Sequence, residues 1–165
     1  MTAALGIPAD YAKKYRLSLH LEATELISIA IGTGDRDILL SRPVAAAWER
    51  MHSAASVAGV TLLALSGFRS IERQAEIIRA KLSAGESIDA ILRVVAAPGY
   101  SEHHTGRAID IGTPGEPPLD EGFARTPAFQ WLGAHAGDYG FLLSYPLGNL
   151  HGIAYEPWHW CHAAH

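Results

Sequence analysis

Two short stretches of this chain carry residue types that could bind a catalytic metal. Residues 101–110 contain His103 and Asp110, and a second stretch near the C-terminus contains Glu156 and His159. A hydrolytic zinc site needs three protein ligands, an open coordination position and a nearby base, and imidazoles and carboxylates are normal zinc donors. The sequence therefore predicts one Zn²⁺ per chain, held by His103, Asp110 and His159, with Glu156 as the general base that takes a proton from the attacking water.

The spacing of these residues does not suit a helical zinc motif. Two ligands on one helix face would lie three or four positions apart, whereas His103 and Asp110 are separated by seven. Gly106 lies between them and would let the chain bend back, so that both side chains reach one ion. Pro157 keeps the second stretch out of a helix interior and biases Glu156 towards extended backbone, so an extended segment is expected there.

Other donors lie near enough in sequence to compete for the metal. His104 adjoins the first ligand, and adjacent side chains of an extended segment point in opposite directions, so His104 is expected to be exposed or to support the ligands. His162 and His165 lie close to the C-terminus, and His162 could in principle replace His159, which is preferred for its spacing to Glu156. Cys161 could add a fourth donor that excludes water, although a lone cysteine is more often a small buried hydrophobe.

The composition limits the class of protein. A chain of 165 residues with 48% hydrophobic and 18% charged residues fits one globular domain. The net charge of −4 and the lack of a basic stripe predict no nucleic-acid partner, and no apolar run approaches the roughly 18–20 residues of a membrane span. The N-terminus lacks a signal-peptide pattern, which predicts a cytoplasmic protein as written, or a periplasmic or envelope protein if a signal was removed.

Hydrophobic periodicity and cap residues predict a mixed order of helices and strands. The first 40 residues give the weakest signals. Helices are expected at 43–58, 71–83, 88–95 and 127–136, strands at 26–31, 60–65, 108–111, 139–144 and 154–160, and a surface loop at 113–122. Because this order lacks regular βαβ alternation, we expect an α+β domain with a mainly antiparallel sheet flanked by helices. On the strand 108–111, Asp110 should point away from Ile109 and Ile111.

The motifs resemble those of the VanY-type D-alanyl-D-alanine carboxypeptidases, which share their zinc core with VanX dipeptidases, some phage endolysins and the hedgehog signalling domain. The resemblance rests on Ser-x-His-x6-Asp, starting at Ser101, and on Glu-Pro-Trp-His at 156–159. It is extended by the segments 66–70, 98–106 and 139–146, and covers about residues 43–161 of a single domain spanning 1–165. It implies a hedgehog/DD-peptidase-like fold.

The resemblance also implies roles for individual residues beyond the three ligands and the base Glu156. Arg69 is expected to face the metal and bind the substrate, because a guanidinium can hold a terminal carboxylate in two hydrogen bonds or meet negative charge on a tetrahedral intermediate. The alternative for Arg69 is a salt bridge at the end of a strand. Gln74, Ser101 and Trp158 are expected to line the substrate site. Ser101 would point the same way as His103 if their segment is extended, and Trp158 could equally belong to the core.

The implied activity is hydrolysis of D-amino-acid-containing peptides of the bacterial cell wall. Removal of the terminal D-alanine from a muropeptide or a peptidoglycan precursor is the leading hypothesis. An L-Ala-D-Glu endopeptidase, an LD-carboxypeptidase and a non-catalytic, hedgehog-like zinc-binding interaction domain remain as alternatives. A structural zinc site closed by Cys161 or His162 is a further one. Glu156 and Arg69 argue against the interaction domain, since a binding module needs no base beside an open zinc position.

Overall fold

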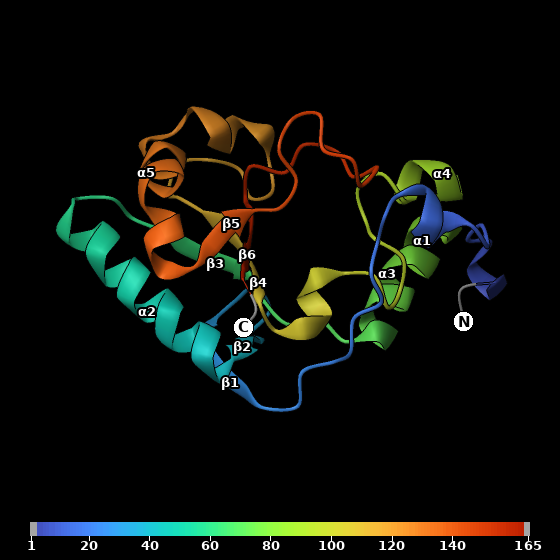
Figure 1. The fold of residues 1–165 in the computed structure, drawn as a ribbon, viewed down its shortest axis with the longest axis horizontal. Helices are drawn as coiled ribbons and strands as arrows, with labels where there is room; N and C mark the ends of the chain where they lie inside the picture. Colours follow the sequence, from blue (N-terminus) through green and yellow to red (C-terminus); the bar gives the residue numbers. More distant parts are fainter. Residues whose placement is uncertain (1–2, 164–165) are drawn as a thin grey trace.

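Two antiparallel sheets form the framework of the computed structural model, which describes residues 3–163 (Figure 1). The larger sheet has four strands in the order β3-β4-β6-β5, and the smaller one is the hairpin β1-β2. The strands are β1 (Leu26–Ile31), β2 (Asp37–Ser41), β3 (Leu63–Ser66), β4 (Ala108–Gly112), β5 (Phe141–Leu143) and β6 (His159–His162). All pairs are antiparallel, as the sequence predicted.

Helices pack at both ends of this framework (Figure 1). The main core joins α2 and α5 to the central strands, and a second core joins the N-terminal residues to α3 and α4. The α-helices are α1 (Tyr11–Lys14), α2 (Arg42–Val57), α3 (Ile71–Ser83), α4 (Ile88–Ile91) and α5 (Pro127–His135). Four 3₁₀ helices complete the described elements: η1 (Ala3–Leu5), η2 (Glu102–Thr105), η3 (Glu121–Arg125) and η4 (Ala136–Tyr139). No helix among residues 3–163 combines the length and apolar character of a membrane span.

Cap residues explain why the longer helices begin and end near their predicted positions. Ser70 accepts a hydrogen bond from the backbone N–H of Arg73 at 3.0 Å and starts α3. Gly85 follows α3 with a φ of +91°, a conformation that favours glycine. Thr126 caps α5 in the same way as Ser70 caps α3, by accepting from the N–H of Phe129.

Strand β4 lies inside the four-stranded sheet and positions the metal-binding side chain of Asp110. Ile109 and Ile111 belong to the main core, whereas Asp110 lies in the buried polar cluster, so the predicted alternation is confirmed. The register pairs Asp110 with His159 on β6 and with Ser66 on β3. Two residues about 50 positions apart in sequence are therefore brought side by side by strand pairing.

Several predicted boundaries are wrong. Helix α4 ends at Ile91 instead of 95, and β3 starts at Leu63 instead of 60. Strand β5 covers only Phe141–Leu143, and β6 starts at His159 instead of 154. The N–H groups of residues 154 and 156 bond outside any ladder, to the carbonyls of residues 93 and 145, which explains why no strand forms there.

Two glycines allow close approach of segments around the site. Gly106 ends η2 with a φ of +65°, and its carbonyl accepts from the N–H of Ser41 at 2.9 Å, which confirms that the chain bends there. A Cβ atom at Gly106 would lie 2.9 Å from that same backbone nitrogen. Gly67 lies against the backbone of Leu39 on β2, where a side chain would collide with the Leu39 carbonyl.

Candidate metal centre

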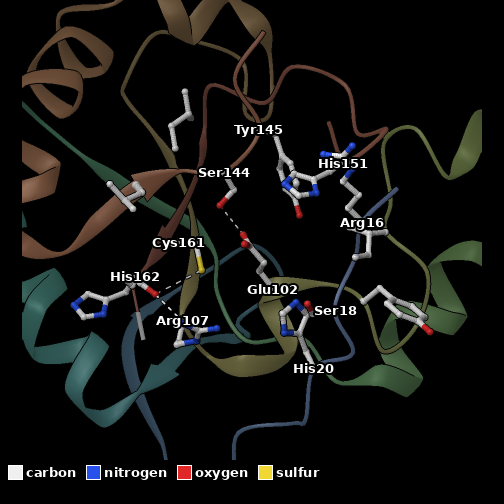
Figure 2. A pocket seen from close by; sticks show the side chains of 15 residues that line it. Arg16, Ser18, His20, Glu102, Arg107, Ser144, Tyr145, His151, Cys161 and His162 are labelled. Carbon is white, nitrogen blue, oxygen red and sulfur yellow. Dashed lines mark hydrogen bonds between the residues drawn. The ribbon is translucent and has the colours of Figure 1, made fainter. Parts of the chain in front are cut away.

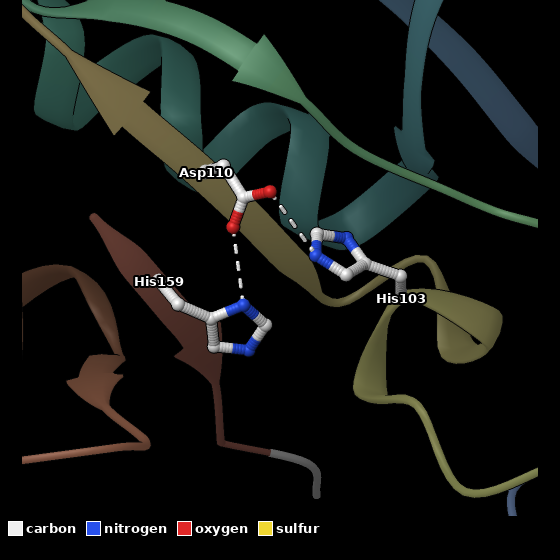
Figure 3. Close-up of side chains that lie close together, drawn as sticks. All are labelled: His103, Asp110 and His159. Carbon is white, nitrogen blue, oxygen red and sulfur yellow. Dashed lines mark hydrogen bonds and ion pairs between the residues drawn. The ribbon is translucent and has the colours of Figure 1, made fainter. Parts of the chain in front are cut away.

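The structure brings His103, Asp110 and His159 together in one buried cluster (Figure 3). Each offers one donor atom, and these atoms all lie within 4.8 Å of one another. His103 comes from η2, Asp110 from β4 and His159 from the first position of β6. Within residues 3–163 no fourth donor joins this group, so the closed structural site that Cys161 or His162 would complete is not formed.

Backbone contact sets the orientation of the His103 ring. Its Nδ1 lies 2.7 Å from the carbonyl oxygen of Gly67, and its Nε2 lies 3.3 Å from Oδ2 of Asp110. A carbonyl can only accept, so Nδ1 must carry the proton. The Nε2 atom of His103 therefore faces the metal position.

The His159 ring has the opposite orientation. Its Nδ1 lies 3.1 Å from Oδ1 of Asp110, and its Nε2 lies 2.9 Å from Oε2 of Glu102. Nδ1 is consequently the atom of His159 that faces the metal position. Each histidine thus offers one nitrogen to the cluster and has the other held by an oxygen, an arrangement found around most metal-ligating histidines.

The cluster is charged in a way that suits one divalent cation. Burial would raise the pKa of Asp110, but the neighbouring His103 and His159 hold the pKa well below its usual range, so the carboxylate is ionised. Burial lowers the pKa of His103, which keeps that ring neutral. Two imidazole nitrogens and one buried carboxylate match the donors that zinc takes, at bond lengths of about 2.0–2.2 Å.

Metal binding is expected to release a proton from His159. Burial lowers the pKa of this ring, but hydrogen bonds to Asp110 and Glu102 outweigh that effect and raise the pKa to about 10. A ligand nitrogen must be unprotonated, so at about pH 8 zinc has to displace one proton, and affinity should rise about tenfold per pH unit. Titration calorimetry in two buffers of different ionisation enthalpy measures the number of protons. Release of none would contradict the assignment of His159 as a ligand.

A cavity of about 450 Å³ opens beside the cluster. Every site residue that the sequence predicted lines it: Arg69, Gln74, Ser101, His103, Asp110, Glu156, Trp158 and His159. The residues come from segments spread over most of the chain. Their meeting in one cavity is what a substrate site around the metal requires.

Arg69 presents its guanidinium to this cavity. Its Nη1 donates to Oε1 of Gln74 at 3.1 Å, and its Nη2 donates to Oγ of Ser66 at 3.4 Å. Gln74 is itself anchored, because its Nε2 donates to the carbonyl of Ala96 at 2.6 Å. Among residues 3–163 no carboxylate lies within salt-bridge distance of Arg69, so the alternative of a strand-end salt bridge is wrong. Gln74 orients Arg69 and leaves its charge available to a ligand.

Glu156 has the environment of a general base. Its Oε2 lies 3.8 Å from Nδ1 of His159. Burial is the main cause that raises the pKa of Glu156 to about 7; Asp110 adds to the rise and His159 opposes it. A carboxyl group with a pKa near neutrality can both accept and return a proton at physiological pH. The segment is a turn and not extended as predicted, since the N–H of His159 donates to the Glu156 carbonyl at 3.1 Å.

Ser101 and Trp158 both reach the cavity, with differences from expectation. Ser101 is buried and precedes the 3₁₀ helix η2, so it does not share an extended segment with His103. Trp158 lines the cavity and also packs against the main core, which means that both interpretations of this residue hold.

The competing donors have structural contacts. His104 is fully buried, and its Nδ1 lies 2.6 Å from the carbonyl oxygen of Arg69 while its Nε2 accepts from the N–H of Gly99 at 3.1 Å. It supports the ligand segment and is not exposed. Cys161 is buried, as a small hydrophobe would be, and its thiol donates to the carbonyl of His162 at 3.8 Å. His165 lies outside the described residues.

Two residues beside the metal position were not predicted. Glu102 contacts His159, and hydrogen bonds from that ring and from Ser144 outweigh burial and lower its pKa to about 2. The ring of Tyr145 lies 4.8 Å from that of His159, centroid to centroid. The only sequence signal for Glu102 was a carboxylate next to a ligand, and an extended backbone would have turned it away. Tyr145 carried no signal beyond its place in the segment 139–146.

Comparison with known proteins identifies the family. Residues 37–165 match the family model VanY, D-alanyl-D-alanine carboxypeptidase. The chain belongs to this family. The resemblance seen in the motifs is thereby confirmed.

A D-alanyl-D-alanine carboxypeptidase of Enterococcus faecium is 33% identical over 138 residues, which cover 82% of this chain and 41% of that relative. The chain therefore spans less than half of the length of that protein. Among solved structures, the LdcB LD-carboxypeptidase is 32% identical with a TM-score of 0.77, covering 87% of this chain and 70% of the other. VanYB, solved in complex with D-alanine-D-alanine, is 25% identical with a TM-score of 0.68, covering 86% and 78%. These likenesses confirm the predicted fold.

Proposed function

We propose that this chain is the catalytic domain of a zinc carboxypeptidase that removes a terminal D-alanine from cell-wall peptides. The observation that carries the proposal is the position of Glu156, with a pKa of about 7, in one cavity with the three-donor cluster and the guanidinium of Arg69. Family membership supports it, because the family is described by this activity. The substrate would be a muropeptide or a peptidoglycan-precursor peptide.

Each residue then has a defined task. Zinc held by His103, Asp110 and His159 would supply a Lewis acid that polarises the scissile carbonyl and acidifies water. Glu156 takes the proton from the attacking water and returns it to the leaving amine, which its pKa near neutrality allows. Arg69 binds the terminal carboxylate of the peptide or the developing negative charge.

If Arg69 binds the terminal carboxylate of the peptide, a carboxypeptidase and an endopeptidase should respond differently to the loss of that carboxylate. Loss of a charge-assisted hydrogen-bond pair costs about 2–4 kcal/mol, equivalent to about 30- to 1,000-fold in kcat/KM. The wild-type protein should prefer a peptide acid over the matching C-terminal amide by such a factor, and Arg69→Ala should lose most of that preference. Equal cleavage of acid and amide by the wild type would favour the L-Ala-D-Glu endopeptidase.

A specific observation favours LD-carboxypeptidase activity as the second candidate. The likeness to LdcB, at 32% identity and a TM-score of 0.77, exceeds the likeness to VanYB, at 25% and 0.68. The two activities use the same metal chemistry and differ in the residue that precedes the terminal D-alanine. The walls of the cavity, including Trp158 and Tyr145, would make that distinction.

The test is product analysis by mass spectrometry after incubation of the zinc-loaded protein with two stem peptides. One ends in D-Ala-D-Ala and the other ends in a single D-alanine attached to an L-residue. Loss of D-alanine from the first supports the DD-carboxypeptidase, and loss from the second alone supports the LD-carboxypeptidase. The same digests with Glu156→Gln protein provide the control. No turnover of either peptide by a protein that binds one zinc would favour the non-catalytic interaction domain.

A further inference from the structure

A buried carboxylate lies on the side of His159 that faces away from the metal position. Oε2 of Glu102 is 2.9 Å from Nε2 of His159 and accepts a hydrogen bond from Oγ of Ser144 at 2.6 Å. Glu102 comes from η2, and Ser144 is the residue that directly follows β5, so two separate segments hold this carboxylate against the ring. Neither Glu102 nor Ser144 lines the substrate cavity, and neither has a task in the proposed chemistry.

The contact bears on which nitrogen of His159 carries a proton. The ring can bind a metal through Nδ1 only if Nδ1 is unprotonated, yet the carboxylate of Asp110, 3.1 Å away, attracts a proton to that atom. An acceptor at Nε2 retains the Nε2 proton, so the proton that zinc displaces comes from Nδ1 and the Nδ1 lone pair is then directed at the metal. Glu102 is placed to be that acceptor.

The two histidine ligands are held in different ways. His103 is fixed by a backbone carbonyl, that of Gly67, at 2.7 Å. His159 is fixed by a side chain, which a substitution can remove without changing the backbone. A substitution can therefore remove the support of His159 while His103 keeps its orientation.

We propose that Glu102 is a positioning residue that holds His159 in the tautomer and orientation needed for metal binding, with Ser144 fixing Glu102. This inference rests on the metal site of the proposed function and adds a residue to it. Replacing a group that holds a ligating histidine lowers metal affinity by about 10- to 100-fold. Because Glu102 does not touch the substrate cavity, the loss should appear in zinc binding and only secondarily in turnover.

Glu102 lines a second cavity, which is distinct from the substrate cavity (Figure 2). It measures about 380 Å³ and is lined by Glu102 and Ser144 together with the basic side chains of Arg107 and His20. Tyr145 lines both this cavity and the substrate cavity, and its ring lies 4.8 Å from that of His159. The Glu102 side chain retains 25% of its exposure, so a small carboxylate such as formate could take its place in a truncated variant.

The experiment measures zinc affinity by competition with a chelator for the wild type, Glu102→Ala, Glu102→Gln and Ser144→Ala. Glu102→Ala should bind zinc about 10- to 100-fold more weakly. Glu102→Gln should lose less, since its amide oxygen still accepts from Nε2, and Ser144→Ala should also lose less. Formate should restore affinity to Glu102→Ala and leave the wild type unchanged. Glu25→Ala, which removes a carboxylate with an 81% exposed side chain, is the matched control and should bind as the wild type does.

Two results would overturn the proposal. One is wild-type zinc affinity in Glu102→Ala, or in Glu102→Gln and Ser144→Ala together if the alanine variant does not fold. The other is a loss of zinc affinity in Glu102→Ala that formate does not reverse and to which Ser144→Ala adds its own full loss when the two changes are combined. Such a result would indicate general destabilisation. Zinc affinity is measured without substrate, so failure of this proposal is distinguishable from failure of the proposed peptidase activity.

Discussion

Replacing Glu156 by glutamine should lower kcat/KM for peptide hydrolysis by about 10²- to 10⁴-fold, the contribution of a general base. The amide keeps the size of the side chain but cannot accept a proton from water. The three-donor cluster does not include Glu156, so zinc should still bind at one equivalent per chain. Steady-state kinetics and metal analysis of the same preparation measure both quantities.

The matched control for this variant is Glu116→Gln, which changes an exposed carboxylate in the loop after β4. It should retain wild-type kinetics. The wild-type profile of kcat/KM should also fall on the acid side as Glu156 becomes protonated, and this limb should disappear in Glu156→Gln. Residual activity of the glutamine variant close to that of the wild type would show that another group takes the proton.

Replacing Asp110 by alanine should remove both metal binding and turnover. Asp110 is the only anionic donor of the cluster, it lies between the two histidines, and its buried carboxylate contacts both rings. Its loss should weaken zinc binding by more than the about 10- to 100-fold that follows from removing a residue that only supports a ligand. Turnover should then fall with zinc occupancy.

Thermal unfolding with and without zinc provides a readout that does not depend on substrate. A metal present at about 100 times its Kd stabilises the folded state by about 2.7 kcal/mol. Zinc should therefore raise the Tm of the wild type and leave that of Asp110→Ala nearly unchanged. Wild-type zinc affinity in a folded Asp110→Ala protein would contradict the assignment of this ligand.

Local signals in the sequence predicted the elements that depend on local chemistry. Helix α3 has the predicted bounds because Ser70 supplies its first hydrogen bond and Gly85 adopts the left-handed conformation that ends it. The alternation on β4 was predictable for the same reason, since Ile109 and Ile111 need a core and Asp110 does not. The three ligands could be named because their residue types and motif are themselves local.

Features that depend on distant partners could not be predicted. Strand β2 exists as the partner of β1 and lies close to Gly67, and its own sequence gives no clear strand signal. The segment before β6 was expected to be a strand, yet its N–H groups bond to the carbonyls of Arg93 and Tyr145. These carbonyls lie outside the segment, and no sequence pattern marks them as its hydrogen-bond partners.

The position of Glu102 shows the same limit inside the metal site. An extended backbone from Ser101 to His103 would have turned Glu102 away from the ligands. The segment instead forms the 3₁₀ helix η2. This directs His103 to the metal position, while Glu102 contacts His159 at Nε2, on the side of the ring that faces away from the metal position. That contact joins two motifs far apart in sequence, so only the folded structure reveals it.

The measurement that tests the central claim most directly is peptide turnover as a function of zinc added to the metal-free protein. Three ligands and one cavity predict that D-alanine release rises in proportion to zinc and stops rising at one equivalent per chain. The same titration of Glu156→Gln should bind one equivalent without turnover. Full activity in the metal-free protein, or activity that still increases well beyond one equivalent, would contradict a peptidase that works with a single zinc.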